Sequence, residues 1–108
     1  MLRCMKKQLR TIQNRIDTIK KLLMEVGMMR PGSLTKQMNR SSKSDKVYEY
    51  WQLSYTHKMR SRTEYVRAGK VEQTQAQVAE FKRFKQLVDE WIDLAIEQAK
   101  LTEKEDDD

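Results

Sequence analysis

The first 26 residues carry the repeat of apolar side chains that most restricts how this chain can fold. From Leu2 onward the apolar positions are separated alternately by three and by four residues. The positions are Leu2, Met5, Leu9, Ile12, Ile16, Ile19, Leu23 and Val26. This spacing places them on one narrow stripe of a helix, as in coiled coils. We therefore expect a helix over residues 1–29 that packs along another long helix, with Gly27 near its end and Pro31 beyond it.

A second long helix is predicted for residues 70–102, a segment without Gly or Pro. Its apolar side chains form two neighbouring rows, which indicates more than one packing partner. One row is Val71, Val78, Phe81, Val88, Ile92, Ala95 and Ala99, and the other is Phe84, Leu87, Trp91, Leu94 and Leu101. The candidate partners are the segment between the helices and the first helix, of the same or of a second chain. We expect residues 103–108 to form a frayed acidic tail.

The segment between the helices is rich in aromatic residues and predicts one β-hairpin over residues 47–68. Strands are expected at 47–56 and 61–67, joined by residues 57–60. Alternation puts Val47, Trp51, Leu53 and Tyr55 on one face and Tyr48, Tyr50, Gln52, Ser54 and Thr56 on the other. An isolated hairpin is marginally stable in water, so the Trp51 and Leu53 face should pack on a helix. Residues 30–46 are polar and basic and predict a loop, which completes a single α+β domain over residues 1–108.

Charge is distributed unevenly along the chain and indicates an anionic partner. Residues 1–70 contain 17 Lys and Arg against 5 Asp and Glu, a net charge of +12, whereas residues 71–108 contain 5 against 11, a net charge of −6. A basic region followed by an acidic one is typical of a nucleic-acid-binding face with a separate acidic helix. Because β-ribbons enter the DNA major groove or follow the backbone, we expect nucleic acid, DNA ahead of RNA, on the hairpin and the basic loop.

The candidate contact residues are cations that lie near phosphates, together with tyrosines that stack on bases or donate to phosphates. They are Arg30, Lys36, Arg40, Lys43, Lys46, Tyr48, Tyr50, His57, Lys58, Arg60, Arg62, Arg67 and Lys70. A second interpretation stays open, in which the hairpin charges only keep the edge of a sheet from pairing with other chains.

The sequence offers little for catalysis or metal binding. One histidine, His57, lies in the predicted turn, one cysteine, Cys4, lies near the start, and no nucleophile, phosphate-loop or dinucleotide motif is present. Asp89, Glu90, Asp93 and Glu97 are about a helical turn apart and suit a divalent ion in principle, but we expect them to form a solvated helix face that complements the basic half of the chain. We expect no cofactor, no metal and no enzymatic activity. No apolar stretch reaches the ~18 residues that span a bilayer, so we expect a cytoplasmic protein.

Four segments of the chain resemble an uncharacterised prokaryotic family of small basic proteins, often found near mobile elements. The segments are residues 30–34 (RPGSL), 50–58 (YWQLSYTHK), 62–67 (RTEYVR) and 81–92 (FKRFKQLVDEWI), within a resemblance that covers residues 30–101. The family usually has a cysteine-rich loop, which implies a metal site, and a Gly in the hairpin turn. Here residues 39–46 contain no Cys or His and Met59 stands near the expected Gly, so a metal site does not follow. The resemblance implies the same order of elements and mobile-element DNA as the ligand.

The paired helices also predict the assembly. We expect a homodimer through the long helices. The alternative function from the sequence is a coiled-coil interaction module whose basic half docks an acidic protein partner.

Overall fold

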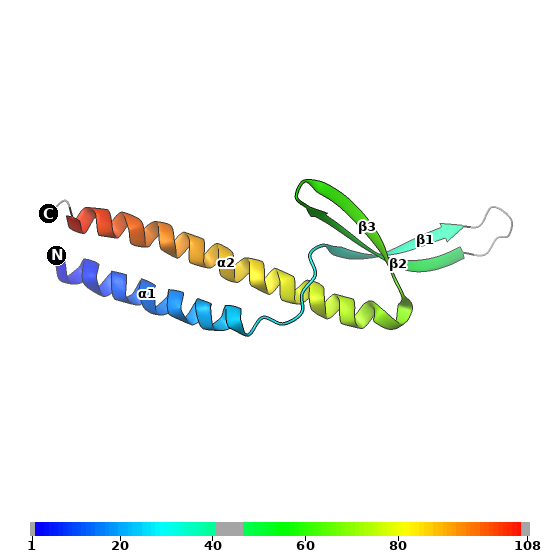
Figure 1. The fold of residues 1–108 in the computed structure, drawn as a ribbon, viewed down its shortest axis with the longest axis horizontal. Coiled ribbons are helices and arrows are strands. Elements are labelled where there is room, and N and C mark those ends of the chain that lie inside the picture. The colour runs from blue at the N-terminus through cyan, green and yellow to red at the C-terminus, as the bar shows by residue number, and fades with distance from the viewer. Residues whose placement is uncertain (1, 41–46, 107–108) are drawn as a thin grey trace. The chain divides into compact units, whose positions relative to one another are not determined.

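The computed structural model describes residues 2–40 and 47–106 and has an α+β fold (Figure 1). Its elements are α1 (Leu2–Met24), β1 (Ser33–Arg40), β2 (Val47–His57), β3 (Arg60–Val66) and α2 (Val71–Asp106), with one 3-10 turn at Ala68–Lys70. The chain forms two compact units. Residues 1–26 and 83–108 make up the helical unit, and residues 27–82 make up the sheet unit. Helix α2 contributes to both.

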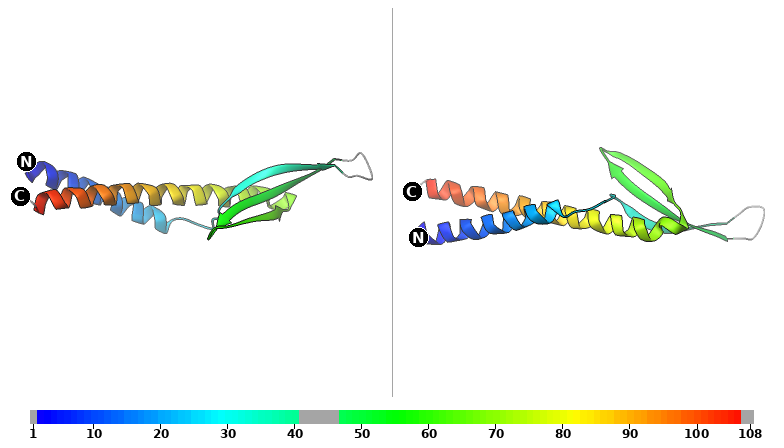
Figure 2. Two further views of the ribbon diagram at one scale, coloured as in Figure 1. Left: turned by 90° about the horizontal axis from the view of Figure 1, so that it is seen from above. Right: turned by 60° about the horizontal axis from the view of Figure 1, so that its bottom comes forward.

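The helical unit is an antiparallel pair of helices, in which α1 lies beside the C-terminal part of α2 in all views (Figures 1 and 2). Ile12, Ile16 and Ile19 of α1 are buried, and so is Leu87 of α2. The alternating spacing of three and four residues is the reason, since it keeps these isoleucines on one side of α1. The predicted helix with a narrow apolar stripe is confirmed.

Helix α1 ends at Met24, before the predicted end at residue 29. Its last turn tightens, because the N–H groups of Glu25 and Val26 donate to carbonyls three residues earlier, at 3.1 and 3.2 Å. The chain that follows is then held by α2 within the sheet unit. The Gly27 N–H donates to Glu80 Oε2 at 3.2 Å, and the Arg30 N–H donates to the Gln77 carbonyl at 3.1 Å. These tertiary contacts replace the helical hydrogen bonds that residues 27–30 would otherwise make.

The sheet has three antiparallel strands in the order β1-β2-β3, so the predicted two-stranded hairpin lacked one strand. The segment predicted as a loop over residues 30–46 contains β1, whose Leu34 pairs with Leu53 of β2. Its sequence, SLTKQMNR, has few of the β-branched and aromatic residues typical of strands. β1 forms because β2 is 11 residues long and offers a free edge of backbone hydrogen-bonding groups. The predicted β2–β3 hairpin itself is confirmed, with His57 paired to Arg60.

One face of the sheet packs on the first turns of α2, as the sequence predicted. Leu53, Val66 and Val78 are buried together, and four half-buried side chains surround them. These are Leu34, Trp51, Tyr55 and Val71. The core therefore draws on all three strands and on α2, which explains how so short a sheet is stable.

The structure also defines the hairpin turn and the C-terminal end of α2. β2 and β3 are joined by Lys58 and Met59, and both have positive φ, 52° and 65°. This matches a two-residue hairpin turn that favours Asn-Gly. Helix α2 continues to Asp106, four residues beyond its predicted end at residue 102, and residues 107 and 108 of the expected tail lie outside the described residues.

Candidate nucleic-acid interface

Strand register divides the side chains of the sheet between two faces. Leu34, Leu53 and Glu64 are aligned across the three strands, and so are Thr35, Gln52 and Tyr65. Since successive side chains alternate between faces, the first three mark the inner face, which carries the core, and the second three mark the outer face. Predicted site residues are found on both.

The outer face contains no charged residue among the three strands as the structure describes them. Its members are Ser, Thr, Gln, Asn and Tyr residues only. They are Ser33, Thr35, Gln37, Asn39, Tyr48, Tyr50, Gln52, Ser54, Thr56, Ser61, Thr63 and Tyr65. A surface of this composition offers hydrogen-bond donors, acceptors and aromatic rings without long-range charge. The predicted placement of Tyr48 and Tyr50 away from the core is confirmed.

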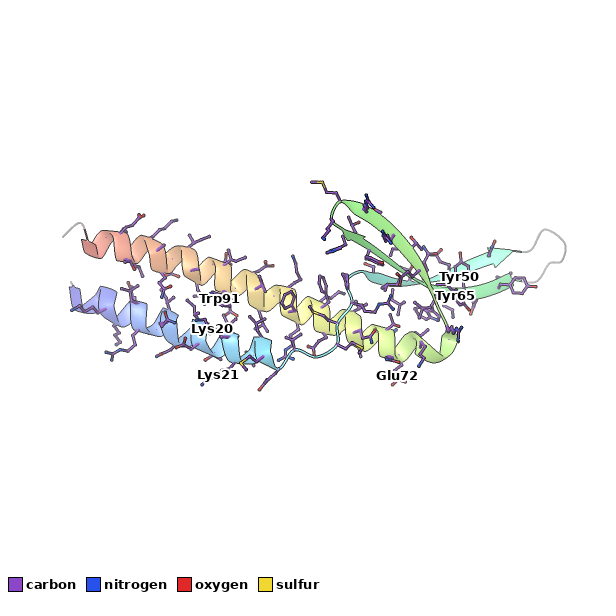
Figure 3. All side chains as sticks on the ribbon, viewed as in Figure 1. Lys20, Lys21, Tyr50, Tyr65, Glu72 and Trp91 are labelled. Carbon is purple, nitrogen blue, oxygen red and sulfur yellow. The ribbon has the colours of Figure 1, made fainter. Side chains whose placement is uncertain are left out.

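Three tyrosines lie on this outer face, two of them in contact. The Tyr50 and Tyr65 rings have centroids 6.4 Å apart and planes tilted by 35°, and Figure 3 shows the two side by side. Tyr48 and Tyr65 are more than half exposed, at 56% and 69%. Across the β1–β2 ladder, Gln37 is paired with Tyr50 and Asn39 with Tyr48. Tyr48 and Tyr50 thus each have a side-chain amide beside them, which can bond a base edge next to a stacked ring.

On the inner face, carboxylates neutralise two of the predicted cations. Arg30 forms an ion pair with Glu64, and Lys36 Nζ lies 2.8 Å from Glu49 Oε2. Tyr55 also donates to Glu64, at 2.9 Å, and this hydrogen bond raises the pKa of the Tyr55 phenol above its usual 10.0. Arg30 and Lys36 therefore contribute to the structure of the sheet unit rather than to free positive charge.

The hairpin turn carries three cations and one histidine that have no such partner. His57, Lys58, Arg60 and Arg62 line one open hollow of about 490 Å³ together with Tyr55. All four are exposed, and within residues 2–40 and 47–106 none of them forms an ion pair or a side-chain hydrogen bond. Register explains the grouping, since His57 pairs with Arg60 and Tyr55 with Arg62. The sequence brought these residues to the turn, and the structure shows that they share one concave surface.

Other predicted site residues lie away from the turn. Arg67 and Lys70 are exposed and follow the far end of β3, about 20 Å along the strand from Arg60. The backbone of Arg40 ends β1, also far from the turn, whereas its side chain and all of Lys43 and Lys46 lie outside the described residues. The structure thus separates one predicted patch into a turn cluster and a second group of residues at the opposite end of the sheet.

Sequence reasoning missed Tyr65, Gln37 and Asn39 as candidate contact residues. Tyr65 was detectable, because the alternation that placed Tyr50 outward also applies to the strand after the turn. Gln37 and Asn39 were not, because they belong to β1, which has no clear strand pattern.

The structure identifies no other centre of chemistry in the part of the chain that it describes. No group of three or more His, Cys, Asp or Glu side chains there is arranged to hold a metal ion. None of the described helices is both long and apolar enough to cross a membrane. Glu90, one of the four carboxylates considered for a divalent ion, is bound by Arg15 instead.

Comparisons with protein-family models, curated proteins and solved structures find no match to this chain. The resemblance to small basic prokaryotic proteins stays a prediction.

Proposed function

We propose that this protein is a non-enzymatic nucleic-acid-binding protein, with DNA ahead of RNA, that places its hairpin turn on the phosphate backbone and forms a homodimer through its helices. The observation that carries the proposal is the cluster of His57, Lys58, Arg60 and Arg62 around one hollow, free of described carboxylate partners. Arg30 and Lys36, by contrast, are neutralised within the sheet unit. A cluster of unpaired cations attracts polyanions strongly, because no internal ion pair has to break first.

Three features of the turn suit phosphate. The guanidinium groups of Arg60 and Arg62 can each bind a phosphate through two hydrogen bonds, in bidentate geometry, and Lys58 adds a point charge on a flexible side chain. The hairpin is narrow enough to enter a major groove about 12 Å wide. The positive φ of Lys58 and Met59 keeps the turn tight, so the cations stay close together.

A salt titration by gel shift tests the proposal. We expect binding of duplex DNA at about 50 mM salt, with log affinity falling by roughly 0.9 per phosphate neutralised for each unit of log salt. Arg60→Ala with Arg62→Ala should weaken binding at least tenfold and reduce this slope by about 2. The matched control is Lys6→Ala with Lys7→Ala, which removes the same charge from exposed positions on α1.

Two results would contradict the proposal. One is an absence of binding at ~50 mM salt, and the other is an equal loss from the α1 control, which would indicate unspecific attraction by net charge. The alternative function, docking of an acidic protein, is tested on the same samples with an acidic peptide as competitor. Purified protein that retains nucleic acid, seen as a 260/280 absorbance ratio that falls after a high-salt wash, favours the nucleic acid over the peptide.

A further inference from the structure

Helix α2 has an exposed strip that lies opposite the side packed on α1. Leu87 and Trp91 are on the packed side, as is Glu90, which pairs with Arg15. Since successive residues are rotated by about 100° around the helix axis, the strip faces away from these three residues, on the opposite side of the helix. Its members are Lys85, Asp89, Ile92, Ile96, Ala99, Lys100 and Glu103, and all are exposed.

The middle of this strip is apolar. Ile92 and Ile96 are each 50% exposed, and Ala99 follows one turn later. Two half-exposed isoleucines on successive turns are unusual on the polar side of a helix, since each leaves apolar area in water at ~25 cal/mol per Å². The strip therefore suits another helix.

The charges on the strip are arranged so that it is complementary to itself. Lys85 stands nine residues before Leu94 and Glu103 nine residues after it, while Asp89 stands five before and Lys100 six after. An antiparallel pair of α2 helices centred on Leu94 would place Lys85 beside the partner's Glu103 and Asp89 beside the partner's Lys100. A parallel pair in register would set like charges against each other instead.

We propose that a second copy of this chain covers the strip, with the two α2 helices antiparallel and related by a two-fold axis at Leu94. Ile92 of each copy then lies on Ile96 of the other. The interface is isologous, because the same patch serves both subunits. This refines the dimer part of the proposed function and does not depend on nucleic-acid binding. The stripe of α1 is already occupied by α2 of its own chain, so α1 is not needed for the dimer.

The strip is short, and the dimer should be correspondingly weak. From Lys85 to Glu103 it extends about 27 Å along the helix. With two isoleucines per subunit at its centre, we expect a dissociation constant on the order of 10 μM, within the range of small interfaces.

Sedimentation equilibrium of the full chain at about 1–300 μM and low salt tests this arrangement. Wild-type protein should pass from monomer to dimer across that range. Lys85→Glu and Glu103→Lys should each weaken the dimer at least tenfold, because in the antiparallel pair each sets two pairs of like charges across the interface. The matched control, Lys6→Glu, makes the same charge change on an exposed position of α1 and should leave the dimer intact.

Mixing the two single variants checks that positions 85 and 103 face each other across the interface. In an antiparallel heterodimer, the glutamate introduced at position 85 of one subunit faces the lysine introduced at position 103 of the other. The unchanged Lys85 and Glu103 form the second pair, so an equimolar mixture should regain wild-type association. Circular dichroism of each variant checks that the helices still form.

Three results overturn the proposal. The first is a chain that stays monomeric up to about 300 μM. The second is a mixture that remains as weak as the single variants. The third is wild-type association of both single variants. This result would indicate a parallel pair, in which position 85 faces position 85 of the partner and position 103 faces position 103, so that like charges oppose each other in the wild type and in both variants. None of these results affects the gel-shift test of DNA binding.

Discussion

Arg15 of α1 and Glu90 of α2 form a bidentate ion pair that connects the two helices of the helical unit. Arg15 Nε donates to Glu90 Oε1 at 2.8 Å, and Nη2 donates to Oε2 at 2.9 Å. Two further contacts join the same helices: the Gln98 amide donates to Gln13 Oε1 at 2.8 Å, and Lys20 lies 5.4 Å from the centre of the Trp91 ring (Figure 3). These polar contacts border the isoleucine stripe and fix the register of α1 on α2.

The Arg15 pair makes the helical unit sensitive to acid. The hydrogen bond from Arg15 lowers the pKa of Glu90 below its usual 4.5. A carboxyl whose pKa is lower in the folded state stabilises it above the usual pKa, and this contribution is lost as the pH falls through the lowered value. Thermal melts from about pH 7 to about pH 2.5 should show a Glu90→Gln variant losing less stability than wild type below about pH 4.5. Parallel curves for the two proteins would show that the pair contributes nothing to the stability of the fold, as is found for many exposed ion pairs.

Gly32→Ala should destabilise the sheet unit by about 2–4 kcal/mol. Gly32 has a φ of +122°, and a Cβ there would lie 2.5 Å from the Ser54 carbonyl oxygen and 2.9 Å from Tyr55 Cβ. Urea unfolding followed by Trp51 fluorescence in a Trp91→Phe background measures this effect, because Trp51 then reports on the sheet unit alone. Gly69→Ala is the matched control, since a Cβ at Gly69 meets no atom within 4 Å.

Met59→Gly should stabilise the hairpin by about 1 kcal/mol, because Met59 has a φ of 65°, where a side chain costs ~1–2 kcal/mol. The Met59 side chain is 99% exposed, so its removal sacrifices no packing. The same Trp51 fluorescence assay should show a higher denaturation midpoint with an unchanged slope. A lower midpoint would contradict the turn geometry, and Met38→Gly, within β1, should destabilise as a contrast.

Tyr65→Ala should weaken binding of single-stranded oligonucleotides more than of duplex DNA. Tyr65 is exposed on the uncharged face, and loss of one stacked base costs about 1–3 kcal/mol, or roughly 5- to 150-fold in affinity. Fluorescence anisotropy with single-stranded DNA, RNA and duplex probes measures the difference. Met38→Ala removes an equally exposed apolar side chain from the opposite face and should leave all three affinities unchanged. Equal losses for duplex and single strand would assign Tyr65 to the phosphate backbone instead.

Much of the fold was predictable, because its strongest signals are local. The spacing from Leu9 to Val26 places Ile12, Ile16 and Ile19 on one side of any helix, whatever that helix packs against. In the same way, alternation in β2 separates Leu53 from Gln52 in any sheet. The order of helix, hairpin and helix follows from these patterns and from the positions of Pro31, Gly32 and Gly69.

The strand β1 was not predictable, because its stability comes from β2 rather than from its own residues. Lys36 and Asn39 have low strand propensity, and only the free edge of β2 gives their backbone groups partners. The early end of α1 has a similar cause, since Glu80 and Gln77 of α2 bind the chain at Gly27 and Arg30.

The sequence by itself determined the basic character of residues 30–70 and the position of cations at the hairpin turn, because charge and turn geometry are properties of neighbouring residues. Only the tertiary structure decided which cations are free. Glu64 and Glu49 neutralise Arg30 and Lys36, since strand register brings residues far apart in the chain within hydrogen-bonding distance. Lys58, Arg60 and Arg62 remain exposed and form no ion pair with a described carboxylate, because the residues paired with Arg60 and Arg62 across the hairpin, His57 and Tyr55, are not acidic.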